Sequence, residues 1–177
     1  MTDQPEFSTN LYLLGMPGSG KSTLGKEVAM VLGVEFHDLD AAIENEAGMN
    51  INQIFNQVGE AGFREIEGKV LKQLTNRPGA KVVALGGGTP CFYQNMEYVN
   101  QNGISIFLNV PLEVIVDRLL AQGTESRPLL KNKSPQELLG QLQEHFLERK
   151  VFYLKALIHL EGSTITADQI LDELHMD

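Results

Sequence analysis

The sequence predicts an α/β protein in which a five-stranded parallel sheet is flanked by helices on both faces. Short apolar runs recur along the chain, and longer segments whose apolar residues have helical spacing separate them. A glycine-rich turn follows the first apolar run and leads directly into an amphipathic segment. Strands that alternate with helices in this way are typical of a parallel sheet covered on both faces.

The strands can be placed in chain order from their apolar character. We expect them at residues 11–14, 34–36, 81–85, 104–110 and 157–160. A helix is expected at 21–33, after the glycine-rich turn. The segment at about 41–75 is helical and longer than a simple crossover needs, so we expect part of it to form a substrate-binding lobe.

Two later helices carry clear start signals. Ser134 is followed by a proline and then by Glu137, which is a capping-box pattern with proline in the first turn. The helix that begins there is expected to run over residues 135–156. Thr166 and Gln169 repeat the capping box before a short final helix.

Length, composition and charge limit what the chain can be. Its 177 residues predict one domain, 1–177, and a formal net charge of −9 argues against nucleic acid or an anionic membrane as the main partner. Cys91 is the only cysteine, and no signal peptide or membrane-spanning run is present, so we expect a cytoplasmic monomer. No metal-ligand spacing links the four histidines, which are His37, His145, His159 and His175.

The glycine-rich turn has the pattern of a phosphate-binding loop. Gly15, Gly20, Lys21 and Ser22 fit G-x-x-x-x-G-K-[ST], between an apolar strand and an amphipathic helix. Glycines let backbone N–H groups approach phosphate oxygens, and the following helix directs its positive end there. Lys21 is expected to reach the β- and γ-phosphates, and Ser22 to ligate Mg²⁺. The alternative is a plain strand-to-helix turn.

Two aspartates follow the second expected strand. Asp38 and Asp40 are two residues apart, so in an extended strand their side chains point to the same side. Ligands of parallel sheets sit beyond the carboxyl ends of the strands. We therefore expect Asp38 to face the Mg²⁺ shell and Asp40 to face an acceptor hydroxyl. The alternative is a polar strand exit in which Asp40 caps the next helix.

Charged residues interrupt the apolar faces of two expected helices. Glu67 lies on the apolar stripe of the helix at 62–74, and Arg64 precedes it at ion-pair spacing. Arg149 lies on the inward face of the helix at 135–156. Arg64 and Arg149 together predict a receptor for a carboxylate, unless Arg149 merely extends its charged end to the surface.

A triple glycine ends the third expected strand. Gly86, Gly87 and Gly88 permit a close approach of backbone to ligand, and their N–H groups can bind anions or hydroxyls. No metal-linked aspartate stands at this strand end, which makes Asp38 the better candidate for that role. The alternative is a plain turn.

The stretch at about 121–134 reads as a mobile lid. The stretch contains three basic residues, Arg127, Lys131 and Lys133, and one acidic residue, Glu125. A cationic loop near a triphosphate is typical of a lid that closes on the transferring phosphate and excludes water. The alternative is a solvated loop.

These motifs, in this order, resemble those of the shikimate kinase family over residues 11–153. The resemblance implies a P-loop, nucleoside-monophosphate-kinase-like fold and transfer of phosphate from Mg·ATP to the 3-hydroxyl of shikimate, in chorismate and aromatic amino-acid biosynthesis. The motifs are G-x-x-G-x-G-K-S-T at 15–23, F-x-D-x-D at 36–40, F-R-x-x-E at 63–67, G-G-G at 86–88, R-P-L-L at 127–130 and E-R at 148–149.

The resemblance also implies roles for individual residues. Catalytic roles fall to Lys21, Asp40 and Arg127, and Mg²⁺ contacts to Ser22 and, through water, Asp38. ATP binding is implied for Gly18, Ser19, Gly20, Lys21, Ser22, Thr23, Arg118 and Arg127. Shikimate binding is implied for Asp40, Phe55, Phe63, Arg64, Glu67, Gly86, Gly87, Gly88 and Arg149.

Other functions remain open from the residues alone. The chain could phosphorylate another small hydroxy acid such as gluconate, or a nucleoside monophosphate. It could also be an inactive nucleotide-binding regulatory module, although Lys21, Asp40 and Arg127 are all present.

Overall fold

One parallel sheet forms the centre of the protein, as the sequence predicts. The computed structural model describes residues 7–122 and 133–174, and all pairings between its five strands are parallel. The strand order is β2-β3-β1-β4-β5. The strands are β1 (Asn10–Leu14), β2 (Glu35–Asp38), β3 (Lys81–Ala84), β4 (Gly103–Asn109) and β5 (Ile158–Glu161). The predicted fold class is therefore confirmed.

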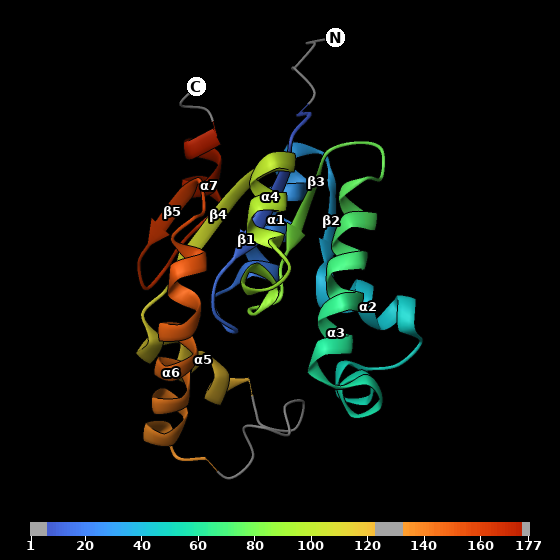
Figure 1. Ribbon diagram of the computed structural model, residues 1–177. Helices are drawn as coiled ribbons and strands as arrows, with labels where there is room; N and C mark the ends of the chain where they lie inside the picture. Colours follow the sequence, from blue (N-terminus) through green and yellow to red (C-terminus); the bar gives the residue numbers. More distant parts are fainter. Residues whose placement is uncertain (1–6, 123–132, 175–177) are drawn as a thin grey trace.

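Helices cover both faces of the sheet, and in Figure 1 α4 lies in front of it and α1 behind. Helix α1 packs against β3 and α7, whereas α4 packs against β4 and the short 3₁₀ helix η1. No helix in the described part of the chain is both long and apolar enough to span a bilayer. The helices are α1 (Lys21–Leu32), α2 (Leu39–Ala47), α3 (Ile51–Thr75), η1 (Thr89–Cys91), α4 (Asn95–Asn102), α5 (Leu112–Ala121), α6 (Pro135–Tyr153) and α7 (Ala167–Leu174).

Strand β1 lies at the centre of the sheet, where both faces are buried. Leu11 pairs with Val82 of β3 on one side and with Ile104 of β4 on the other. The four residues from Leu11 to Leu14 have no exposed surface. Continuous burial explains why this strand reads as an unbroken apolar run and not as an alternating one.

The helix starts that the sequence marks are present. The Ser134 hydroxyl accepts from the Glu137 N–H at 3.2 Å, and the Glu137 carboxylate accepts from the Ser134 N–H at 2.7 Å. The capping box at Thr166 and Gln169 is formed in the same way. Helix α3 carries a break at Gly59, whose φ of 71° is left-handed, so its first turns take a different direction from the rest.

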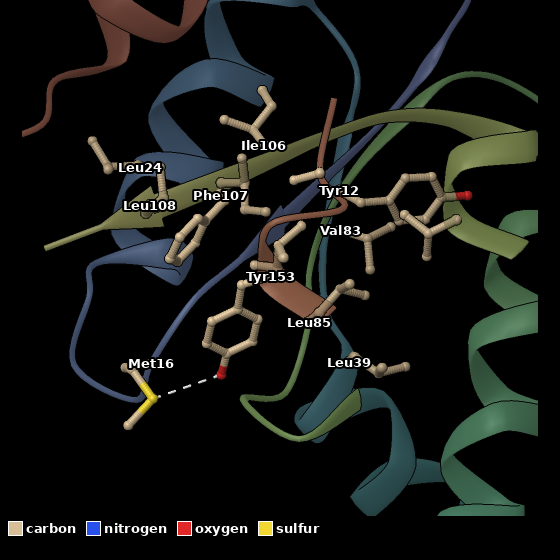
Figure 2. Close-up of a cluster of buried hydrophobic side chains, with 14 of the residues drawn as sticks. Tyr12, Met16, Leu24, Leu39, Val83, Leu85, Ile106, Phe107, Leu108 and Tyr153 are labelled. Atoms are coloured by element: carbon tan, nitrogen blue, oxygen red, sulfur yellow. Dashed lines mark hydrogen bonds between the residues drawn. The ribbon is translucent and has the colours of Figure 1, made fainter. Parts of the chain in front are cut away.

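The core extends from the sheet to the end of α6. Figure 2 shows Tyr153, the last residue of α6, with its hydroxyl directed at Met16 of the turn after β1. The rings of Tyr153 and Phe107 are 5.1 Å apart, and Tyr153 has no exposed surface. This packing holds the end of α6 beside the glycine-rich turn.

Candidate functional site

A pocket of about 590 Å³ opens at the carboxyl ends of β1, β2 and β3, which are neighbours in the sheet. The turn after β1, the aspartates around the end of β2 and the glycines after β3 all line it, so three separate motifs meet at one edge. Its lining includes Gly18, Ser19, Gly20, Lys21, Ser22, Thr23, Asp38, Asp40, Gly86, Gly87, Arg118, Gln122, Ile165 and Thr166.

The glycine-rich turn has the backbone of a phosphate-binding loop. Gly15, Gly18 and Gly20 have φ values of 145°, 84° and 99°, which side-chain-bearing residues rarely adopt. The Lys21 ammonium donates to the carbonyls of Gly15 and Met16, each at 3.0 Å, and Lys21 is 8% exposed. A buried cation is thus held against the loop at the amino end of α1, where an anion is also favoured by the helix dipole.

Asp38 links the end of β2 to the first turn of α2 and to the phosphate-binding loop. Its carboxylate caps α2, because it accepts from the N–H groups of Asp40 at 3.0 Å and Ala41 at 3.3 Å. The other carboxylate oxygen accepts from the Ser22 hydroxyl at 2.6 Å. The expectation that Asp38 and Asp40 share an extended strand was wrong, because the cap starts a helix at Leu39. The helix cap that the alternative gave to Asp40 is formed by Asp38.

Asp40 nevertheless faces the pocket from the first turn of α2. Its side chain is open to the pocket, yet the surrounding protein removes enough water to raise its pKa to about 6. The negative charges of Asp38 and Glu67 raise this pKa further, and the nearby Lys21 opposes them. A carboxyl with this pKa can accept a proton near neutral pH, which suits a general base.

Arg64 and Glu67 form the buried ion pair that their spacing predicts. Arg64 Nη1 lies 2.9 Å from Glu67 Oε2, and the Glu67 side chain is 1% exposed. Glu67 Oε1 accepts from the Thr89 hydroxyl at 2.7 Å. Arg64 Nε is buried and finds no acceptor among the described residues. A buried donor without an acceptor is unfavourable, so this unsatisfied group calls for a structural or functional explanation.

Little space is left beside the triple glycine, and none of its three residues has a positive φ. A methyl group on Gly88 would lie 2.5 Å from Arg64 Nη2, and one on Gly87 would lie 3.0 Å from Arg149 Nη1. A methyl group on Gly86 would lie 2.9 Å from Asp40 Oδ1. Both arginines and the aspartate therefore touch one short turn, although they come from α3, α6 and α2.

Two aromatic rings lie against the Arg64 guanidinium. Phe55 and Phe63 stack with their centroids 4.4 Å apart, and the Arg64 guanidinium lies 5.1 Å from the Phe63 ring. Phe92 is closer to it, at 4.3 Å, and was not predicted. Phe92 and Thr89 both follow the triple glycine within four residues, but neither residue type has a pattern that would single it out.

Arg118 closes the other end of the pocket. It donates to the carbonyls of Gly18 and Ser19 at 3.4 and 3.3 Å and to that of Ser163 at 2.8 Å. Ile165 and Thr166 line the same end and were also missed, because the sequence there carries no phosphate or metal motif. Most of the expected lid at 121–134 lies outside the described residues, and so do Arg127 and Lys131.

The fold and this pocket define a P-loop protein whose phosphate-binding loop lies beside a glycine turn that Arg64 and Arg149 approach. A family model described as shikimate kinase matches residues 17–176. A shikimate kinase from Phocaeicola vulgatus is 43% identical over 84% of this chain and 83% of its own length. The chain belongs to the shikimate kinase family, and it is a phosphotransferase of that family.

Solved structures support the same assignment. A shikimate kinase from Bacteroides thetaiotaomicron superposes with a TM-score of 0.87 at 35% identity, over 95% of this chain and 98% of that one. One from Acinetobacter baumannii, in complex with shikimate, gives a TM-score of 0.81 at 35% identity, over 96% of this chain and 92% of that one. The predicted family is therefore confirmed.

Proposed function

We propose that this chain transfers the γ-phosphoryl group of ATP to the 3-hydroxyl of shikimate, giving shikimate 3-phosphate and ADP for chorismate and aromatic amino-acid biosynthesis. The observation that carries the proposal is the glycine turn at 86–88. It touches Asp40, Arg64 and Arg149, and its first two glycines also line the pocket that contains the phosphate-binding loop. An acidic alcohol bound there would have its hydroxyl within reach of the nucleotide.

On the nucleotide side we assign phosphate binding to the loop and to Lys21. The amides of Gly18, Ser19, Gly20 and Thr23, with the Ser22 side chain, surround the position that the α1 dipole favours for an anion. Lys21 is already held beside the loop and needs only to exchange carbonyl acceptors for phosphate oxygens. Arg118 is assigned to the adenine end, and Arg127, from its motif alone, to the transferring phosphate.

The residues at the loop fit a magnesium ion that arrives with ATP. Mg²⁺ prefers a few carboxylate or hydroxyl contacts together with phosphates and water. Ser22 and Asp38 supply a hydroxyl and a carboxylate that already touch at 2.6 Å. We assign Ser22 to direct contact and Asp38 to contact through water. When bound, the ion would neutralise charge on the β- and γ-phosphates.

On the acceptor side Asp40 is assigned to the reacting hydroxyl. The hydroxyl proton passes to the Asp40 carboxylate as the oxygen forms its bond to the γ-phosphorus and the bond from that phosphorus to the ADP oxygen breaks. A pKa of about 6 leaves Asp40 ionised above neutral pH, so that it is ready to accept this proton.

The shikimate carboxylate is assigned to Arg64 and Arg149. Glu67 orients Arg64 through their ion pair, in which Arg64 Nη1 and Glu67 Oε2 are 2.9 Å apart. The stacked rings of Phe55 and Phe63 provide an apolar wall for the carbon ring. Gly86, Gly87 and Gly88 leave the space that this close approach requires.

We further propose that the enzyme works in the cytoplasm as a monomer whose partners are small molecules. The net charge of −9 opposes binding to nucleic acid or anionic membranes. Its anionic substrates must therefore be attracted by the local cations Lys21, Arg64 and Arg149.

The test is a coupled assay of ADP formation with Mg·ATP. Shikimate should stimulate ADP release, whereas gluconate and AMP at the same concentration should not. Mass spectrometry should find phosphate on the 3-hydroxyl. Stimulation by gluconate alone, or ADP release that is independent of any acceptor, would overturn the proposal.

A further inference from the structure

A buried tyrosine joins the two sides of the pocket. The Tyr153 hydroxyl lies 2.5 Å from the carbonyl oxygen of Gly87 and 3.7 Å from the sulfur of Met16. Gly87 belongs to the acceptor side and Met16 to the phosphate-binding loop. Figure 2 shows the hydroxyl directed at Met16 from the end of α6. None of the roles assigned above uses Tyr153.

The direction of this hydrogen bond is fixed by chemistry. A carbonyl oxygen only accepts, so the single proton of Tyr153 is donated to Gly87 over the shorter distance, and the sulfur is at most a weak second acceptor. Burial raises the pKa of Tyr153 above its ordinary value, so the hydroxyl keeps its proton at any working pH.

The hydrogen bond from Tyr153 is accepted by a peptide whose backbone is intrinsically flexible. Glycine has the widest backbone freedom, and the peptide between Gly87 and Gly88 has glycine on both sides. Because a peptide is planar and trans, holding the Gly87 carbonyl toward Tyr153 makes the Gly88 N–H point away from Tyr153. Rotation of this peptide would separate the buried hydroxyl from its acceptor, which is unfavourable.

The same helix carries the arginine of the acceptor side. Arg149 precedes Tyr153 by one helical turn, and its Nη1 would lie 3.0 Å from a methyl group on Gly87. The Tyr153 bond therefore fixes the distance between the glycine turn and the part of α6 that presents Arg149.

We propose that Tyr153 is a positioning residue whose hydroxyl holds the Gly87–Gly88 peptide and the neighbouring Arg149 in the arrangement that receives the acceptor carboxylate. This inference rests on the proposed function, because it takes the glycine turn and Arg149 as the acceptor side. It predicts an effect on the acceptor that a merely structural hydrogen bond would not have.

The test compares Tyr153→Phe with Tyr12→Phe. Both tyrosines have no exposed surface, and the Tyr12 hydroxyl is bonded to Thr75 at 2.9 Å, away from the pocket. Both variants should lose similar thermal stability. Only Tyr153→Phe should raise the KM for shikimate, by roughly tenfold, the equivalent of one buried hydrogen bond, with the KM for ATP unchanged.

Three results would overturn the inference: an unchanged shikimate KM in Tyr153→Phe, an equal rise in both KM values, or the same shikimate effect in Tyr12→Phe. If Tyr153→Phe does not fold, Tyr153→4-aminophenylalanine decides, because its N–H can replace the lost donor. A shikimate KM like that of the unchanged protein supports the inference, and a tenfold rise contradicts it. Turnover of shikimate by the unchanged protein tests the proposed function separately.

Discussion

The proposed nucleotide side and the proposed acceptor side of the site are built in different ways. The phosphate-binding loop is one contiguous stretch, and its form depends on glycines with positive φ and on backbone amides. The acceptor side brings together side chains from α2, α3 and α6 around a turn of three glycines. Its central pair, Arg64 and Glu67, is buried and bridged to Thr89.

This difference indicates where each side is vulnerable. A backbone cradle tolerates most side-chain changes, provided that its glycines and Lys21 remain. A network of buried charges loses much when one member is removed, because the remaining charge stays buried without its partner. Substitutions on the acceptor side should therefore change shikimate kinetics while nucleotide binding persists.

The largest effect is expected for Asp40→Asn. The amide cannot accept the hydroxyl proton, so kcat should fall by roughly 10²–10⁴-fold, while the KM for ATP changes little. The folded protein should be at least as stable at pH 8, because the carboxylate that is lost was disfavoured there. Steady-state kinetics and thermal unfolding measure the two effects. Unchanged turnover would remove Asp40 from the mechanism.

A smaller effect is expected for Glu67→Gln, which leaves Arg64 without its buried counter-charge. The free energy of unfolding should fall by about 3 kcal/mol, and the KM for shikimate should rise by roughly a hundredfold, through a misplaced guanidinium. The matched control is Glu60→Gln, since Glu60 lies 3.6 Å from Arg64 but is 63% exposed. That variant should behave like the unchanged protein. Equal effects of the two would show that burial of the pair is unimportant.

Activity should also depend on pH through Asp40. Because the ionised carboxylate is the proposed base, kcat/KM for shikimate should fall about tenfold per unit as pH drops below about 6, and level off above it.

The folding stability of the protein should respond to pH in the opposite direction. The folded state binds a proton that the unfolded state, with its pKa of 3.8, has released, so the contribution of Asp40 to stability decreases as pH rises from about 4 to 6. An acidic limb that persists in Asp40→Asn would assign the titration to another group.

The sequence predicts the phosphate-binding loop better than the proposed acceptor side, because only the loop is one contiguous stretch. The loop, its strand and its helix are contiguous, so spacing alone identifies them. Arg64 and Glu67 are three residues apart on one helix and could also be paired from spacing. Thr89 and Phe92 could not, because their contacts depend on how η1 packs against α3. The geometry of Asp38 was mistaken since a capping aspartate looks the same in sequence as one that ends a strand.

In the proposed site, arginines bind the acceptor carboxylate independently of the nucleotide. Calorimetric titration of Arg149→Ala with shikimate and, separately, with a non-hydrolysable Mg·ATP analogue tests it most directly. Lys150→Ala, which removes an exposed cation from the same helix, is the control and should bind both like the unchanged protein. Arg149→Ala should lose at least about a hundredfold in shikimate affinity, as expected for a charge-assisted contact, and keep its nucleotide affinity. Equal loss of both affinities, or unchanged shikimate binding, would contradict it.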